Sequence, residues 1–413
     1  MAVLNSCGTT NSLSEKNVSD VYRTGNEIVQ AEFQIHHDAD TTSTLHFQID
    51  TEKLLYAKQT SSDTYTGRVK LKYEIYPSFE SRVLIDSNSV VVQDVIQNDQ
   101  RELLYGNFPI PISFGKRYVV KLTTTDLYRE KSSIAYVAVD KSSRYVRQNY
   151  LALDAKTEVP LFRSWFYENE KILISYHHSR SKKLSVSYYN HEFDIAPPPF
   201  AVYNHKLFDY KTSDVFQITE YGNNTYSFEA SRRGFYHIQA DSSDREGFTL
   251  FHYHDGFPKI NSTEEMVSAL RFITSKKEFK ELTESDRQKL ELDQFWLKIA
   301  NNPARARELI KAYYNRVQNA NIFFSCHKEG WKTDRGIIYI VFGPPDIVYK
   351  SSSAESWVYG EENNYLSVTF NFLKVDNPFT RNDFTLKRAP IYKNQWYRAV
   401  DSWRQGRVTS LDY

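Results

Sequence analysis

Cysteine is scarce in this chain: its 413 residues include only two, Cys7 and Cys326. Two cysteines cannot form the disulfide framework of a small secreted domain. Charge of either sign is not in excess, since 52 basic and 51 acidic residues give a formal net charge of +1. That balance removes the usual electrostatic argument for nucleic-acid binding. No run of apolar residues approaches the roughly 20 that a membrane-spanning helix requires.

Glycine is also sparse, at 14 residues, whereas aromatic residues make up 15% of the chain and include 30 tyrosines and 26 phenylalanines. This composition suits twisted, half-buried sheets, in which tyrosine offers an apolar ring and a polar tip. The length exceeds the roughly 250–300 residues at which single hydrophobic cores stop growing, so we expect several domains.

Two regions, residues 26–145 and 150–258, have the pattern of antiparallel strands. In the first region, residues 68–75 alternate between charged and apolar side chains, which is typical of a sheet with one wet face. In the second region, Pro197-Pro198-Pro199 marks a loop or an edge, because proline cannot donate to a strand ladder. Each region predicts a β-sandwich domain.

The pattern changes to a helical one from residue 260. Ser262 and Glu265 form a possible capping box, and Asn302-Pro303 places a capping side chain before a proline at the first helical position; both are helix start signals. A closing helix is expected from Tyr392 to Arg404.

Strands are expected within the same C-terminal region. Residues 337–342 are apolar on both faces, which predicts a central buried strand. Residues 366–372 alternate, which predicts a strand with one wet face. The fold class is therefore multidomain: two N-terminal antiparallel β-sandwich domains followed, over residues 260–413, by an α+β domain of helices and then an antiparallel sheet.

Two glycine-containing corners enclose the apolar run: Gly330 to Gly336 before it and Gly343-Pro344-Pro345-Asp346 after it. The first corner resembles the GWxTD domain, named for residues that match Gly330, Trp331, Thr333 and Asp334. The resemblance covers about residues 261–387. Further matching residues are Phe295-Trp296, Asn302-Pro303, Tyr313-Tyr314, Arg316-Val317, Ala320-Asn321 and Trp357-Val358-Tyr359.

The resemblance implies a bacterial envelope or secreted protein, in which this domain commonly lies at the C-terminal end. It brings no established catalytic mechanism, so it assigns no catalytic residue. The succession of helices and antiparallel sheet is also similar to the small lipoproteins that assist outer-membrane assembly, a likeness of fold alone.

Cys7 follows Leu4-Asn5-Ser6 and precedes Gly8, an arrangement that resembles a bacterial lipobox and predicts lipidation of Cys7. The apolar stretch before it is shorter than the ~7–15 residues of a signal peptide, so we expect that the natural start lies upstream or was trimmed. Residues 1–25 are thus interpreted as a lipobox remnant and a flexible tether. Cys326 is expected to be a small buried side chain.

The motif corners have three possible roles: a structural corner, a surface for a partner protein, or a catalytic site. The candidate partner-contact residues are Gly330, Trp331, Thr333, Asp334, Arg335, Gly336, Gly343, Pro344, Pro345, Asp346, Trp357 and Tyr359. The second corner lacks the Lys and Ser/Thr of a phosphate-binding loop, which argues against nucleotide binding.

We expect a non-enzymatic lipoprotein of the outer membrane, anchored through Cys7, without cofactor. Its expected partner is an outer-membrane or periplasmic complex for outer-membrane protein assembly, secretion or motility. One alternative is a hydrolase that uses Asp334, Asp346 or Glu355 with His327 nearby. Another is a glycan-binding envelope protein, based on the abundant aromatics. His252 and His254 share a strand face and form a weak metal candidate.

Overall fold

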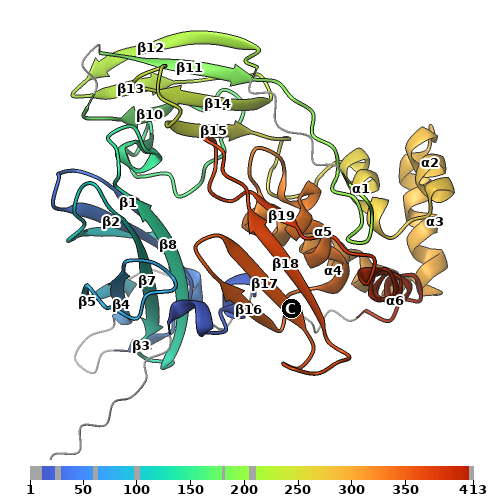
Figure 1. Cartoon of the computed structure of the whole chain (residues 1–413). Helices are drawn as coiled ribbons and strands as arrows, with labels where there is room; N and C mark the ends of the chain where they lie inside the picture. The colour runs from blue at the N-terminus through green and yellow to red at the C-terminus, as the bar shows by residue number, and fades with distance from the viewer. Residues whose placement is uncertain are drawn as a thin grey trace, which may run out of the picture. The chain divides into compact units, whose positions relative to one another are not determined.

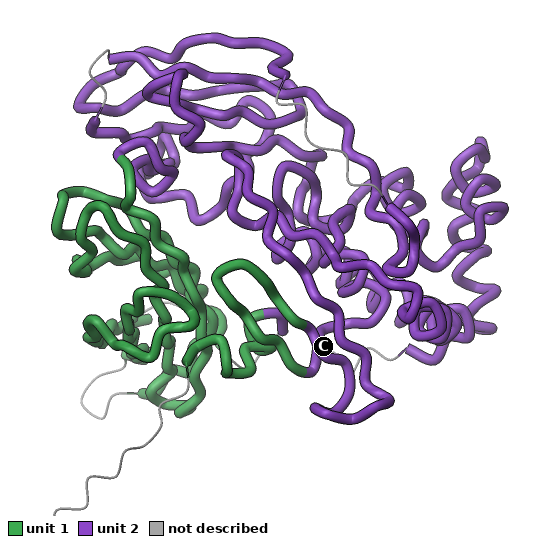
Figure 2. The backbone as a smooth tube through the Cα atoms, in the orientation of Figure 1, with its two compact units in different colours: residues 1–21, 25–143, 347–356 green, residues 22–24, 144–346, 357–413 purple. Residues whose placement is uncertain are grey.

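The computed structural model describes residues 12–23, 29–58, 64–96, 103–178, 182–203 and 211–408. The chain divides into two units, coloured separately in Figure 2. Unit 1 comprises residues 1–21, 25–143 and 347–356, and unit 2 comprises residues 22–24, 144–346 and 357–413. None of the described helices is long and apolar enough to cross a bilayer.

Unit 1 contains two antiparallel sheets (Figure 1). The first has the order β1-β2-β6, formed by β1 (Ala31–His36), β2 (Ser43–Asp50) and β6 (Leu103–Ile110). The second has the order β3-β4-β7-β8, with β5 paired to β4; its strands are β3 (Tyr56–Lys58), β4 (Tyr65–Tyr76), β5 (Asp86–Ile96), β7 (Arg117–Asp126) and β8 (Lys131–Asp140). Apolar side chains of both sheets share one core, in which Ile35 and Leu45 meet Tyr73 and Val120. The prediction of antiparallel sheets in the N-terminal region is confirmed.

The flexible tether expected over residues 1–25 is wrong for residues 12–23. These residues form two short 3-10 helices, η1 (Leu13–Glu15) and η2 (Ser19–Tyr22). Leu13 is buried, and the Ser14 N–H donates to the Phe79 carbonyl at 2.9 Å. The polar composition suggested a linker, but the few apolar residues are enough to fix the segment on a core. Cys7 lies outside the described residues.

Unit 2 begins with a seven-stranded antiparallel sheet of order β15-β14-β11-β12-β13-β10-β9. The sheet encloses one aromatic-rich core, to which both ends of the strand order contribute, for example Ala152 of β9 and Leu250 of β15. Its strands are β9 (Leu151–Asp154), β10 (Ile172–Ser175), β11 (Lys183–Tyr189), β12 (Asp214–Gly222), β13 (Thr225–Phe228), β14 (Gly234–Gln239) and β15 (Phe248–His252).

Helices and a last sheet follow, which confirms the order predicted for the C-terminal region. The α-helices are α1 (Thr263–Ala269), α2 (Lys276–Glu284), α3 (Gln288–Ala300), α4 (Pro303–Phe324), α5 (Asp334–Phe342) and α6 (Tyr392–Arg404). Two short 3-10 helices, η5 (Leu270–Phe272) and η6 (Gly330–Lys332), lie among them. Two others, η3 (Thr51–Lys53) and η4 (Arg147–Asn149), lie earlier in the chain. The capping box of Ser262 and Glu265 opens α1, and Asn302 caps α4 with Pro303 as its first residue. The last sheet has the order β16-β17-β18-β19, with β16 (Ile347–Lys350), β17 (Ala354–Tyr359), β18 (Val368–Lys374) and β19 (Phe384–Leu386).

The central buried strand predicted over residues 337–342 is wrong: these residues belong to helix α5. Thr333 caps the helix by accepting the Gly336 N–H at 3.0 Å, and Gly343 ends it. All residues of 334–341 are buried. A short run that is apolar on every side fits a fully buried helix as well as a buried strand. Here the capping residue Thr333 and the surrounding core stabilise the helix, although the β-branched residues prefer strands.

His37 makes unit 1 sensitive to acid. Its Nδ1 lies 2.8 Å from the Ser43 hydroxyl and its Nε2 lies 2.8 Å from the Asp140 carbonyl. Burial, which outweighs the Asp140 bond, lowers the pKa of His37 from 6.5 to about 4. The neutral ring therefore stabilises the fold above pH 6.5. As the pH falls from 6.5 toward 4, His37 becomes protonated in the unfolded chain but stays neutral in the folded one, so the free energy of unfolding decreases.

We expect His37 alone to cost up to about 3 kcal/mol of the free energy of unfolding across that pH window. Urea unfolding at pH 7.5 and 4.5 measures the loss. His37→Gln, which carries no titrating ring, should reduce the difference between the two pH values, whereas His177→Gln at an exposed ring should leave it unchanged. An equal acid sensitivity in His37→Gln and the parent protein would disprove the assignment.

Candidate functional site

The first motif corner is a place where backbone packs directly on backbone. A Cβ on Gly330 would lie 1.9 Å from the Ala320 carbonyl oxygen, and a Cβ on Gly336 would lie 1.9 Å from the Gly330 carbonyl oxygen. Neither glycine has a positive φ, so close packing and not backbone conformation requires glycine here. Their role is to let η6 approach α4 and α5, both of which it contacts. Helices α4 and α5 also pack against each other (Figure 1).

The side-chain polar atoms of Thr333 and Asp334 form hydrogen bonds that stabilise the same corner. The Thr333 hydroxyl donates to the Gly330 carbonyl at 2.7 Å. The Asp334 carboxylate accepts the Leu386 N–H at 2.7 Å and two Arg388 N–H groups at 2.5 and 3.1 Å. Asp334 thereby joins the start of α5 to β19 and to the segment that follows it.

Arg335 is buried rather than exposed to a partner. Its guanidinium donates to the Asn382 carbonyl at 2.9 Å and lies over the rings of Phe324 and Phe384 at 5.1 and 4.1 Å. It also reaches the Tyr22 hydroxyl at 3.4 Å. Arg335 therefore connects Tyr22, from the short 22–24 segment of unit 2, to the core of that unit.

The second corner is equally occupied by structural bonds. Gly343 has a φ of +91°, and its carbonyl accepts the Tyr359 hydroxyl at 2.8 Å. The exposed Asp346 accepts the Gly360 N–H at 2.7 Å. Trp357 is fully buried. Pro344 is half-buried and Pro345 is buried.

The acidic residues named for a hydrolase have separate partners. Asp334 pairs with Arg388, Asp346 holds a backbone N–H, and Glu355, within unit 1, lies 3.2 Å from the Lys350 ammonium. Each of these carboxylates therefore bonds a structural partner of its own.

His252 and His254 do not form a chelating pair. Strand β15 ends at His252, so the alternation on which the pairing rested stops there. His254 Nδ1 lies 2.8 Å from the Glu329 carboxylate, and its Nε2 lies 2.8 Å from the Lys259 carbonyl. Both ring nitrogens of His254 are thus committed, and the weak metal candidate is wrong.

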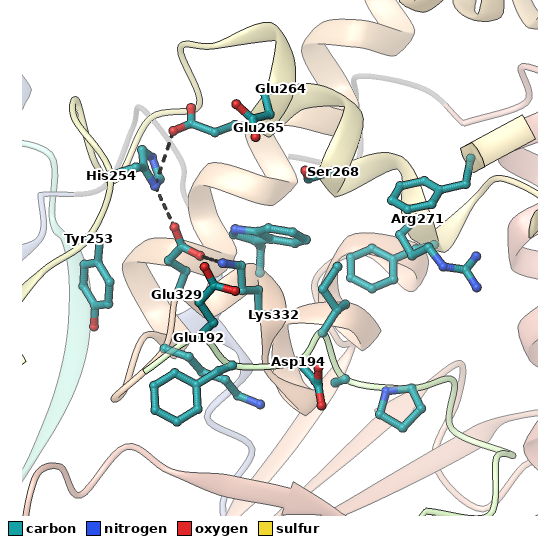
Figure 3. A pocket seen from close by; sticks show the side chains of 18 of the residues that line it. Glu192, Asp194, Tyr253, His254, Glu264, Glu265, Ser268, Arg271, Glu329 and Lys332 are labelled. Atoms are coloured by element: carbon teal, nitrogen blue, oxygen red, sulfur yellow. Dashed lines mark hydrogen bonds and ion pairs between the residues drawn. The ribbon is translucent and has the colours of Figure 1, made fainter. Parts of the chain in front are cut away.

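A pocket of about 1930 Å³ lies within unit 2, beside the first motif corner (Figure 3). Trp331 forms part of its wall, although only 4% of this residue is exposed. The other walls come from the segments 190–203, 252–265 and 268–279 and from α6. Because these segments lie far apart in the sequence, no local pattern could have revealed the pocket.

One side of the pocket carries a network of charges. Glu329 accepts from His254 and pairs with Lys332, and Glu265 lies 3.8 Å from His254 (Figure 3). Burial alone would lower the pKa of His254, but the bonds to Glu329 and Lys259 raise it. Burial alone would raise the pKa of Glu329, but His254 and Lys332 lower it. Both groups are therefore favoured in their charged forms.

Three further carboxylates, Glu192, Asp194 and Glu264, are exposed in the lining. None of the three has a hydrogen-bond or ion-pair partner among the described residues. The basic Arg271 lies on the opposite side of the pocket from His254 in Figure 3, over the Phe279 ring at 5.3 Å. The pocket lining thus contains three exposed carboxylates, together with the basic residues Arg271, Lys276 and Lys328.

The fold and the buried corner define an α+β domain organised around a Gly-Trp-x-Thr-Asp segment and preceded by antiparallel sheets. Residues 234–405 match the GWxTD domain, which is therefore present in this chain. The match begins at β14, upstream of the roughly 261–387 span over which the sequence resembles this domain.

No curated protein matches the chain. Among solved structures, it is similar to a red sea bream transglutaminase at 10% identity and a TM-score of 0.20, over 56% of this chain and 32% of that one. The chain therefore spans about a third of the length of that enzyme. A TM-score this low supports no conclusion about fold or activity.

Proposed function

We propose that this protein is a non-enzymatic accessory subunit of a bacterial envelope complex, and that it binds an extended, basic segment of a partner protein in the pocket beside Trp331. The observation that carries the proposal is the set of unpaired carboxylates, Glu192, Asp194 and Glu264, in the lining of this pocket.

The size of the pocket favours a polypeptide over a small molecule. Pockets for small ligands typically enclose about 300–1000 Å³, and this one encloses about 1930 Å³. A segment of several residues fills such a volume.

The lining favours basic and apolar side chains in that segment. A lysine or arginine between Glu192 and Asp194 gains charge-assisted hydrogen bonds. Phe272 and Phe279 line the pocket as well and can accept apolar side chains.

The chain already places one extended segment against this surface. The Ala196 N–H donates to the Lys332 carbonyl at 2.9 Å, Arg388 donates to the Pro197 carbonyl at 3.0 Å, and the Ala389 N–H donates to the Pro199 carbonyl at 3.1 Å. Residues 190–198 form neither helix nor strand, and their backbone-mediated contacts support the proposal that a second extended segment binds here.

The structural hydrogen bonds of the motif residues support a non-catalytic role. Thr333, Asp334 and Arg335 are buried and hydrogen-bonded to other parts of the fold, so the motif positions the pocket wall. The proposal includes a lipid anchor at Cys7, which rests on the lipobox-like sequence. It also includes an outer-membrane location and a part in outer-membrane protein assembly, secretion or motility. A hydrolase and a glycan-binding protein are the alternatives to it.

A photo-crosslinker in place of Tyr397, a half-exposed residue of the lining, tests the proposal in the native host. We expect it to capture one membrane-complex subunit, and Glu192→Lys with Asp194→Lys to reduce the yield about tenfold, since like charges replace attraction. Glu168→Lys, an exposed carboxylate outside the pocket, is the matched control. Cys7→Ala should move the protein out of the membrane fraction.

Equal capture by the parent and the double variant would refute the pocket, and unchanged fractionation of Cys7→Ala would refute the anchor. Binding of synthetic lysine-containing extended peptides, followed by fluorescence anisotropy, supplies the same comparison in solution. There the affinity should fall about tenfold in the double variant and stay constant in Glu168→Lys.

A further inference from the structure

A second cluster of chemically active side chains lies behind the pocket, in unit 2. Cys326 Sγ, a ring nitrogen of His327 and a carboxylate oxygen of Asp383 all lie within 4.8 Å of one another. We propose that these three residues bind a divalent transition metal ion, and that Zn²⁺ fits the donor set best.

The three donors come from two elements that the fold brings together. Cys326 and His327 lie in the connection between α4 and η6, and Asp383 directly precedes β19. His327 Nδ1 is 3.7 Å from Asp383 Oδ2. That distance is too long for a hydrogen bond and close to the roughly 3.3 Å that separates two ligand atoms on one tetrahedral zinc ion.

The donor types select the metal. Thiolate, imidazole and carboxylate are the three ligand classes that zinc takes in proteins, and a thiolate disfavours magnesium and calcium, which prefer oxygen. Three protein ligands leave a fourth position to water. His327 lines the large pocket, which gives the ion a route from solvent.

The surroundings hold the donors in place. Asn377 donates to Asp383 Oδ2 at 3.0 Å, and the Val375 N–H donates to the Asp383 carbonyl at 2.8 Å. The His327 ring packs against Phe193 with centroids 4.6 Å apart. Outer partners of this kind orient the ligands of metal sites and raise their affinity.

Cysteine, histidine and aspartate also occur together in nucleophilic enzymes, but the burial of Cys326 argues against that role. Cys326 is 1% exposed. A substrate cannot reach such a sulfur. A metal ion can: it forms a bond to sulfur as the S–H bond breaks, the proton leaves to solvent, and nothing is oxidised or reduced.

Cobalt(II) titration of the full chain tests the site. Cys7→Ser is the parent, because Cys326 is then the sole cysteine. We expect the thiolate-to-cobalt charge-transfer absorption and the intense visible bands of tetrahedral Co²⁺, and displacement of both by Zn²⁺. Cys326→Ser should abolish the charge-transfer absorption.

The remaining variants distinguish the residues that bind the metal ion from the residues that only hydrogen-bond to those ligands. His327→Gln and Asp383→Asn should each weaken Co²⁺ binding by more than the roughly 10–100-fold that an outer partner contributes, and Asn377→Ala should weaken it within that range. His191→Gln, at another histidine of the pocket lining, is the control. Circular dichroism verifies that each variant folds. An absent charge-transfer band in the parent, or unchanged affinity in a folded Asp383→Asn, would overturn the proposal.

Discussion

Replacing Gly336 with alanine is expected to lower the free energy of unfolding of unit 2 by about 4 kcal/mol or more. The new methyl group would lie 1.9 Å from the Gly330 carbonyl oxygen and 3.1 Å from the Trp331 Cα. Both neighbours are backbone atoms, so no side chain can rotate away. Either η6 moves off α5 and opens the motif corner, or the fold is lost.

Gly330→Ala should have a comparable effect, because its methyl group would lie 1.9 Å from the Ala320 carbonyl oxygen of α4. Gly222→Ala is the matched control in the same unit: no atom lies within 4 Å of the added group, and its φ of +159° is close to extended backbone, so we expect a much smaller loss. Urea unfolding followed by tryptophan fluorescence measures all three. A loss in Gly336→Ala no larger than that in Gly222→Ala would contradict the close backbone packing.

The helix starts were predictable because their signals are local. Ser262 and Glu265 lie within one turn, and Asn302 and Pro303 are adjacent, so the sequence itself contains the hydrogen-bond partners that begin α1 and α4. The period-2 pattern of β4 was equally direct, since Val69, Leu71, Tyr73 and Ile75 alternate with less buried residues along the strand and are all buried.

Helix α5 was not predictable by the same means. Its isoleucines and valine favour strands intrinsically, and its burial on every side removes the periodic contrast that distinguishes a helix. The deciding information was that Thr333 reaches the Gly336 N–H and that the surrounding helices and β19 cover all faces. That information resides in tertiary contacts, which a local pattern does not contain.

The candidate sites were hidden for a related reason. Glu192, Glu264 and Trp331 come from three distant segments, and Asp383 joins Cys326 across a gap in sequence that matches no known metal spacing. The motif was recognisable because one segment contains it, whereas the pocket and the metal cluster exist only after folding.

Asp334→Asn is expected to cost about 3–5 kcal/mol, because it leaves the cation of a buried ion pair without its counter-charge. The Asp334 and Arg388 side chains are 11% and 10% exposed, with their nearest N–O distance at 2.5 Å. Asparagine keeps the shape and an oxygen for the Leu386 N–H, so the loss reports the charge. Arg388 would retain its bond to the Pro197 carbonyl, which moderates the loss without replacing the carboxylate.

Arg388→Met in the same chain should restore at least half of that stability, since removing both charges together avoids the cost of burying one alone. Glu278→Gln serves as the exposed comparison, because its pair with Arg404 is about a third exposed and should contribute about 1 kcal/mol or less. Thermal and urea unfolding of the single and double variants complete the cycle. If the double variant were as unstable as the sum of the two single ones, Asp334 and Arg388 would act independently. The side chain at position 334 would then link helix α5 to β19 through the Leu386 N–H and not to the segment after β19.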